Sequence, residues 1–221
     1  MVQMTRIESG TAVIGTPMQP KTETDAGLLC FSAGTMIETP SGERAVERLR
    51  AGDMVWTADA GIQPIRWIHQ RRISRAELRA DETLRPILIG QHAFGRGTPE
   101  RPLRVSPQHR VCISGWRAEL FFGAPEVLVP ACQLVNGDKI TQPLPGEDVV
   151  YVHFLLDGHQ IVRSNGLLSE SFHPTKQAMG HMDAASFQEV VRIFPDVLNA
   201  DGRFSQTARV VVKADAARLV Y

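Results

Sequence analysis

The stretch Cys30–Thr57, CFSAGTMIETPSGERAVERLRAGDMVWT, is the part of the sequence that decides the fold. It starts with a cysteine and small residues, and then alternates short runs of strand-forming residues with glycine, proline and aspartate turns. Glycine and proline are the strongest local breaks in secondary structure. Short strands separated by such turns predict an all-β fold.

The same pattern continues beyond this stretch as far as about Gly166. Two short helical stretches interrupt it, at Ala45–Leu49 and Ala131–Val135. Strands this short and this frequent predict a compact β fold of the meander or barrel type. The expected strand runs are GTMIETPSG, DMVWTADAG, PIRWIHQRRI, RPILIG, LRVSPQHRVCISG, EVLVP and VVYVHFLLD.

A unit that begins at Val46 is repeated at a constant offset of 85 residues. It consists of a short helix, a Gly-Asp turn, a strand, a second turn and another strand. One such unit cannot bury its apolar face alone, so we expect the two copies to pack about a pseudo-two-fold axis. Asp53 and Asp138 are expected to hold the matched turns. The matched pairs are Leu49 with Leu134, Gly52 with Gly137, Asp53 with Asp138, Val55 with Ile140 and Gly61 with Gly146.

The two ends of the chain differ from this β-rich part, which we expect to form one domain over residues 28–174. Residues 1–27 are rich in Thr, Pro, Gly and Met and predict a flexible leader. Residues 175–221 predict a small mixed appendage with one helix. That helix is expected over Asp183–Phe194, where apolar residues recur at helical spacing, and Pro195 ends it.

The composition is that of a globular chain and argues against several classes of partner. Of the 221 residues 43% are hydrophobic, and 24 Lys and Arg balance 24 Asp and Glu. Nucleic-acid and membrane partners usually leave a basic excess, so we expect neither. The basic segment Arg66–Arg79 is interpreted as a solvated face. Met1–Pro20 has no apolar run of signal-peptide length and no stretch predicts a membrane span, so a cytoplasmic location is the default and non-classical export stays open.

The three cysteines, Cys30, Cys112 and Cys132, predict neither a disulfide framework nor a zinc site, because their number is odd and no CxxC spacing occurs. Cys112 and Cys132 lie among apolar residues and are expected to be small buried hydrophobes. Cys30 has a glycine-turn context and a peptide presented before it. No metal or organic cofactor is expected, since GRGTP at Gly95–Pro99 lacks the strand, helix and lysine of a phosphate-binding loop.

Three blocks, in this order, resemble those of the Hint superfamily, the fold shared by inteins and the autoprocessing domains of hedgehog proteins. Cys30–Thr57 resembles the amino-terminal splicing block, and VSPQHRV at Val105–Val111 resembles the block with a Thr-x-x-His pair. VVYVHFLLDGHQIVRSNG at Val149–Gly166 resembles the late block that ends in an Asn-Gly turn. The agreement looks closest to bacterial stand-alone Hint proteins. It implies an all-β, Hint-type fold with pseudo-two-fold symmetry.

The resemblance also implies autocatalytic processing, in which Cys30 attacks the Leu29 carbonyl and an N–S acyl shift turns the peptide bond into a thioester. Such a site needs a good nucleophile, a proton for the leaving nitrogen and donors for the developing oxyanion. His109 suits the proton transfers, and Ser106 suits fixing the scissile carbonyl. His159 matches the late-block histidine and would activate the carbonyl or a water. The substrate would be the chain's own N-terminal segment, and water or an amine would be the acceptor.

Departures from the family pattern leave other hypotheses open. No His-Asn pair follows Asn165-Gly166, so full splicing is not expected. Ser106 stands where the family has threonine, and Leu29 stands where hedgehog-type sites favour glycine. The second hypothesis is therefore a non-catalytic or weakly active Hint module that binds a partner. A conventional hydrolase that uses the Cys/His pair in trans fits less well.

Each candidate residue also has a purely structural interpretation. Cys30 alone would be a buried core cysteine, His109 a strand histidine and His159 a turn residue. His153 and Asp157 lie four residues apart, which on a strand places them on the same face. That placement suits a polar relay better than a metal site, because a third ligand is not defined.

Overall fold

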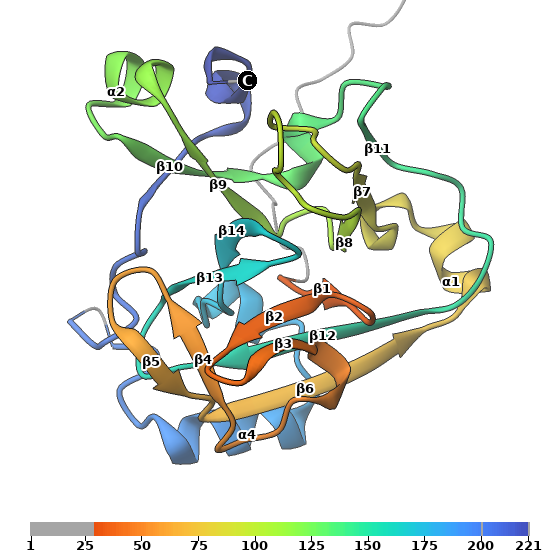
Figure 1. Cartoon of the computed structure of the whole chain (residues 1–221). Coiled ribbons are helices and arrows are strands. Elements are labelled where there is room, and N and C mark those ends of the chain that lie inside the picture. Colours follow the sequence, from red (N-terminus) through yellow and green to blue (C-terminus); the bar gives the residue numbers. More distant parts are fainter. Residues whose placement is uncertain (1–28, 200, 221) are drawn as a thin grey trace, which may run out of the picture.

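The computed structural model describes residues 29–199 and 201–220, so the predicted leader lies outside the described residues. This part of the chain folds into two sheets with few helices (Figure 1). The fold is all-β, as the strand and turn pattern predicts. Helices lie mainly at the edges of the sheets and in the C-terminal region.

The first sheet has the strand order β11-β7-β8-β1-β12-β6, and all its neighbours pair antiparallel. β6 and β12 pair over their whole length and form its longest ladder. Its strands are β1 (Phe31–Ser32), β6 (Trp67–Ile73), β7 (Ile87–Ile89), β8 (Leu103–Val105), β11 (Ile140–Thr141) and β12 (Val149–Leu155).

The second sheet has the order β15-β10-β9-β14-β13-β2-β3, and β4 joins it by pairing with β13 and β5. Its pairs are antiparallel except for β10 with β15. The strands are β2 (Met36–Thr39), β3 (Gly42–Ala45), β4 (Met54–Thr57), β5 (Gly61–Pro64), β9 (Arg110–Ser114), β10 (Glu126–Pro130), β13 (Ile161–Ser164), β14 (Leu167–Glu170) and β15 (Val210–Val211).

The helices are short, and no helix in residues 29–199 or 201–220 is long and apolar enough to cross a membrane. The α-helices are α1 (Arg75–Ala80), α2 (Trp116–Phe122), α3 (Lys176–Met179) and α4 (Ala184–Ile193). The 3-10 helices are η1 (Val46–Arg48), η2 (Glu82–Leu84), η3 (Ala131–Leu134) and η4 (Ala214–Leu219).

The repeated unit is visible in the structure. η1 and η3 occupy matched positions, and each directly follows a strand, β3 in the first copy and β10 in the second. The turns after them contain Gly52 and Gly137, whose φ angles of 93° and 76° favour glycine. The strands that end the two copies, β6 and β12, pair with each other and join the two halves of the fold.

The two matched turns are held by different side chains. In the first copy, the Asp53 carboxylate accepts a hydrogen bond from the Arg50 backbone N–H at 2.8 Å, as predicted. In the second, Asn136 accepts from the backbone N–H groups of Asp138 and Ile140, both at 3.0 Å. The prediction for Asp138 was therefore wrong in its detail, because an Asx-type turn two residues earlier already satisfies the backbone there.

The first part of the C-terminal appendage, with α3 and α4, packs against β6 and β12 in a second apolar cluster, whereas β15 pairs with β10 and η4 contacts η3 and α2 beside the main core (Figure 1). The appendage contains α3, α4, η4 and β15 and not just the one helix predicted. α3 and η4 are too short to show an apolar period in the sequence. The cluster consists of Leu29, Trp67, Leu155, Phe172, Ala178, Met179, Val190, Phe194, Val197 and Phe204.

Candidate active site

The register of the first sheet places Cys30 between two polar residues. β1 lies between β8 and β12, so Cys30, one residue before β1, lies opposite His153 of β12 and beside Ser106, which follows β8. Directly opposed residues of antiparallel strands point to the same face of the sheet. The fold thus brings together side chains that are 76 and 123 residues away from Cys30 in the sequence.

Hydrogen bonds hold Cys30 at its sulfur and at its backbone. Its Sγ lies 3.1 Å from Nδ1 of His153. Its backbone N–H, which belongs to the Leu29–Cys30 peptide bond, donates to Oγ of Ser106 at 2.8 Å, and its carbonyl accepts from the Ser106 N–H at 3.0 Å. The nitrogen that would leave in a cleavage is therefore already paired with a hydroxyl.

Burial keeps this sulfur and imidazole uncharged. Burial raises the pKa of the Cys30 thiol, and the positive charge of Arg71 opposes this rise. Burial lowers the pKa of His153 to about 3. At neutral pH the pair is thus a thiol beside a neutral imidazole. A neutral ring with a free lone pair on Nδ1 can accept the proton of the thiol.

His109 packs against Phe31, the residue after Cys30, and forms no hydrogen bond to Cys30. Its backbone N–H donates to the Ser106 carbonyl at 3.1 Å, and its ring packs edge-on against Phe31 with centroids 4.4 Å apart. Within residues 29–199 and 201–220, neither ring nitrogen has a hydrogen-bond partner. Burial lowers the pKa of His109 to about 4. A buried imidazole with both nitrogens unpaired is costly for the fold, and such exceptions are frequent at functional sites.

His159 lies apart from this group, in a buried ionic cluster. Its Nε2 is 3.1 Å from the Glu170 carboxylate, and its Nδ1 accepts from the Ala208 backbone N–H at 2.9 Å. Glu170 is also paired with Arg110 at 3.0 Å. The ring of His159 stacks on His173, with centroids 4.7 Å apart. Nδ1 of His159 thus links the appendage to the β domain, while Nε2 pairs within the β domain, and the structure does not bring this residue to Cys30.

Asp157 and Asn165, two further polar residues of the late block, form structural contacts away from Cys30. Asp157 lies beyond the end of β12, where it forms an ion pair with Arg66 at 2.7 Å, so it does not form a relay with His153. Asn165 forms a turn with φ of 49°, and its side chain accepts from the Met36 N–H at 2.7 Å and donates to the Pro102 carbonyl at 2.8 Å.

The sequence interpretation did not predict the contact between His153 and Cys30. The run VVYVHFLLD is almost entirely apolar, and five consecutive residues from Tyr151 to Leu155 are buried. A histidine inside such a run is expected to lie in the interior and to need a polar partner there. That signal points to an interior partner for His153, but only the strand order shows that the partner is Cys30.

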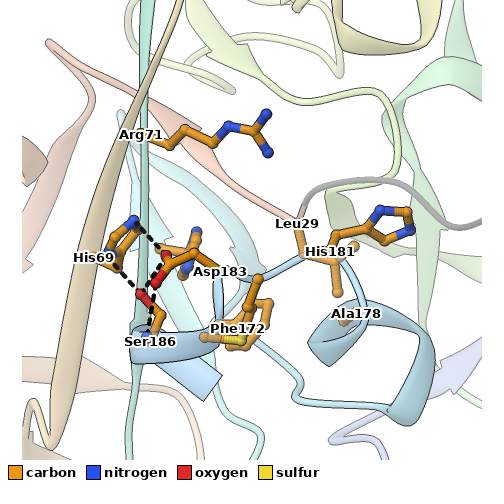
Figure 2. Close-up of a pocket in the computed structure, with 10 residues that line it drawn as sticks. Leu29, His69, Arg71, Phe172, Ala178, His181, Asp183 and Ser186 are labelled. Atoms are coloured by element: carbon orange, nitrogen blue, oxygen red, sulfur yellow. Dashed lines mark hydrogen bonds and ion pairs between the residues drawn. The ribbon is translucent and has the colours of Figure 1, made fainter. Parts of the chain in front are cut away.

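A cavity of about 240 Å³ lies beside this group, between the appendage and the face of β6 and β12 (Figure 2). Arg71, which the sequence placed on a solvated face, lines one wall of it. The other lining residues are Leu29, His69, His153, Phe172, Ala178, His181, Met182, Asp183 and Ser186. No cluster of three or more His, Cys, Asp or Glu side chains suited to a metal ion occurs among the described residues.

A family model described as the Hint domain matches residues 29–176. The chain belongs to the Hint domain family. The match spans every strand of the two sheets except β15 and the whole Cys30 group, and it ends at the start of α3, so most of the appendage lies outside the Hint match. No curated protein matches the chain.

Solved structures of inteins and intein-like domains are similar to the Hint domain of this chain. A bacterial intein-like domain from Clostridium thermocellum is 14% identical with a TM-score of 0.46, over 66% of this chain and 100% of that one. The MchDnaB-1 intein is 13% identical with a TM-score of 0.41, over 64% and 99%. A DnaB intein from Synechocystis sp. PCC 6803 is 13% identical with a TM-score of 0.40, over 65% and 98%.

We expect the buried histidines to destabilise the Hint domain in acid. Burial lowers the pKa of His109 and His173 to about 4 and that of His153 to about 3. Free imidazole titrates near pH 6.5, so below that pH the unfolded chain binds protons that the folded chain does not. The contribution of these neutral imidazoles to stability is therefore full above about pH 6.5 and is lost as the pH falls towards 4. The free energy of unfolding should fall by about 2 kcal/mol for each buried imidazole between pH 6.5 and pH 5. The three imidazoles together cost about 6 kcal/mol, so calorimetry should show a thermal midpoint roughly 15 °C lower at pH 5 than at pH 7.5.

The exposed His181 provides the matched control for this pH dependence. H181Q should keep the same difference between the two midpoints, whereas H109Q should reduce it, because glutamine does not titrate. Equal midpoints at pH 5 and pH 7.5 in the unmodified chain would show that the buried imidazoles do not govern acid stability.

Proposed function

We propose that this Hint domain processes itself by an N–S acyl shift at Cys30, which cleaves the Leu29–Cys30 peptide bond without full splicing. The observation that carries the proposal is the pairing of Cys30 at both reacting atoms. The sulfur that would attack is 3.1 Å from a neutral imidazole, and the nitrogen that would leave is 2.8 Å from a hydroxyl. Neither of these two hydrogen bonds, which both involve a side chain, is needed to complete a β ladder.

In the first step, the sulfur of Cys30 bonds to the carbonyl carbon of Leu29 while its proton passes to Nδ1 of His153. The carbon–nitrogen bond then breaks, and the nitrogen of Cys30 becomes an amine by taking up one proton. We assign this proton to His109 in its imidazolium form, and His153 releases the thiol proton to solvent. Because the pKa of His109 is about 4, the imidazolium is a strong acid but a minor species at neutral pH. We therefore expect slow, single-turnover cleavage.

Packing of Leu29 supports the same reaction. Its side chain is buried in the second apolar cluster, against residues of the appendage. This packing fixes the residue that carries the scissile carbonyl, and positioning a reacting group in this way lowers the entropic cost of an intramolecular attack. A bulky residue before the nucleophile, which departs from the hedgehog-type pattern, is therefore accommodated by the part of the chain beyond the Hint match.

The proposal is tested by intact-mass spectrometry of freshly purified protein, incubated with and without a small thiol. Thioester formation predicts a peptide that ends at Leu29 and carries the added thiol, together with a chain that begins at Cys30. Absence of both species after long incubation would contradict the proposal.

Ser106 should contribute to the rate through its hydroxyl. S106A removes the acceptor of the Cys30 N–H, and we expect cleavage to slow by roughly 10-fold to 100-fold, which corresponds to about 1.4–2.8 kcal/mol of barrier. S106T keeps a hydroxyl at the same position and should retain most of the rate. Mass-spectrometric time courses of the two variants decide this, and equal rates for S106A and S106T would refute a role for the hydroxyl.

A second candidate function is a non-catalytic Hint module that binds a partner. The observation that favours it is the apolar surface of α2, where Trp116, Leu120 and Phe121 are 68%, 66% and 48% exposed. Exposed apolar side chains that gather on one helix mark interaction surfaces. Identical masses for the unmodified chain and C30A, with or without thiol, would favour this candidate over cleavage.

A further inference from the structure

The cavity adjoins the bond that the proposed reaction would activate. Leu29 lines it on one side, and His153, the partner of the Cys30 sulfur, lines it on another. Its volume of about 240 Å³ exceeds that of a single water molecule, which occupies about 30 Å³ in the liquid. A small molecule placed here would contact Leu29, which carries the scissile carbonyl, and the imidazole that is paired with the sulfur.

A buried polar atom in the wall of this cavity lacks a partner. His153 is 5% exposed, and its Nε2 has no hydrogen-bond partner among the described residues, while its Nδ1 faces the sulfur. Buried polar atoms are normally satisfied by protein, water or ligand. A small polar molecule bound in the cavity could supply the partner that Nε2 lacks.

A second imidazole, that of His69, lines the cavity beside His153, and the appendage holds it in place (Figure 2). His69 lies opposite His153 in the β6–β12 ladder, with ring centroids 5.6 Å apart. Its Nδ1 is 3.2 Å from Oγ of Ser186, and its Nε2 is 3.9 Å from the Asp183 carboxylate. Ser186 in turn donates to Asp183 at 2.7 Å. Asp183 and Ser186 lie beyond the Hint match, at the start of α4.

We propose that this cavity is the acceptor site of the reaction and that His69, held by Asp183 and Ser186, is the base that activates a small N–H or O–H nucleophile within it. The inference rests on the thioester proposed above. Strand spacing supports the placement, because His69 and Cys30 flank β12 at roughly 10 Å, two inter-strand steps of about 4.8 Å. His153 of β12 lies between them, and the cavity is lined by both imidazoles and by Leu29.

The resolving step balances as follows. The nucleophile bonds to the carbonyl carbon of Leu29 and gives its proton to His69. The carbon–sulfur bond breaks, and the sulfur of Cys30 leaves as a thiolate that takes up a proton through His153. Water as nucleophile yields a carboxylate at Leu29, and a primary amine yields an amide. The appendage thus completes a site that the Hint match alone does not contain.

The test separates formation of the thioester from its resolution. Intact-mass time courses are recorded for the unmodified chain, H69Q and D183N, in water alone and with added methylamine. Trapping with a small thiol measures thioester formation in each sample. D183N keeps an asparagine at the N-cap of α4, a residue that caps helices as well as aspartate does, so it removes the charge but preserves the helix start. D201N, an exposed change elsewhere in the appendage, is the control.

We expect H69Q to form the thioester at the rate of the unmodified chain but to resolve it about 100-fold more slowly. D183N should resolve the thioester about 10-fold more slowly. Hydroxylamine, a strong nucleophile that needs no base, should rescue both variants. If hydrolysis is faster than amide formation with methylamine, water is the acceptor. If amide formation is faster, the acceptor is an amine. Resolution by H69Q at the unmodified rate overturns this inference alone. Absence of any trapped thioester in the unmodified chain overturns the proposed function and this inference together.

Discussion

Replacing Cys30 with alanine is expected to abolish cleavage between Leu29 and Cys30 and to leave the fold intact. Only the sulfur can form the new bond to the carbonyl carbon, and alanine offers no atom that replaces it. The sulfur is buried in a small cluster with Ile73, Leu78 and Tyr151, so its removal costs about 1 kcal/mol of stability. Intact mass after prolonged incubation should show a single full-length species.

Cys112 supplies the matched control for this variant. It is also a buried cysteine, but it lies on β9 in a different apolar cluster, with Leu128 and Ile161. C112A should cleave at the rate of the unmodified chain. Cleavage at Leu29 that persists in C30A, or that is lost equally in C112A, would show that the thiol of Cys30 is not the nucleophile.

Replacing His153 with alanine is expected to slow thioester formation by about 10²-fold to 10⁴-fold, the usual contribution of a positioned general base. The thiol stays protonated because burial raises its pKa, so attack depends on a group that takes its proton as the bond forms. His153 Nδ1, at 3.1 Å, is the group placed to do so. The rate of trapping by a small thiol measures this step.

Chemical rescue distinguishes a base from a structural residue at this position. The alanine variant leaves a ring-sized space that adjoins the cavity, so added imidazole should enter and restore part of the rate. Rescue that saturates with imidazole concentration supports the assigned role. H92N is the control, because His92 has a φ of 59°, which asparagine tolerates, and takes no part in the proposed reaction. A rate in H153A equal to that of H92N would remove His153 from the mechanism.

Much of the site could be predicted from local sequence. The glycine context of Cys30 pointed to the proposed nucleophile, and the short spacing between Ser106 and His109 keeps those two residues close in any fold. The structure brings Ser106 to the Cys30 nitrogen and packs His109 against the adjacent Phe31. The Hint family membership and the all-β class followed from the order of the blocks and from the pattern of short strands.

The rest of the site depends on which strands are neighbours, which local patterns do not contain. His153 reaches Cys30 only because β12 lies beside β1, and His69 reaches the cavity only because β6 lies beside β12. His159 has the expected position in the sequence, yet its contact with Ala208 depends on where the appendage docks. No spacing rule within the β domain carries that information.

Two helices of the β domain were missed for a different reason. α1 has only one buried residue, so it shows no apolar period, but its capping box of Ser74 and Glu77 is readable in the sequence. α2 also has one buried residue, and it is bracketed by Gly115 and Gly123, the latter in a left-handed C-cap. Both helices could therefore have been found from their ends, and not from their hydrophobic pattern.

The most direct test of the central claim is to locate the activated acyl group itself. The unmodified chain is treated with hydroxylamine, which converts a thioester to a hydroxamate, and the released peptide is analysed by tandem mass spectrometry. The account predicts a hydroxamate on the carbonyl carbon of Leu29 and a second fragment whose free amino terminus is Cys30. A hydroxamate at another residue, or an intact chain under conditions in which the protein is folded, would contradict it.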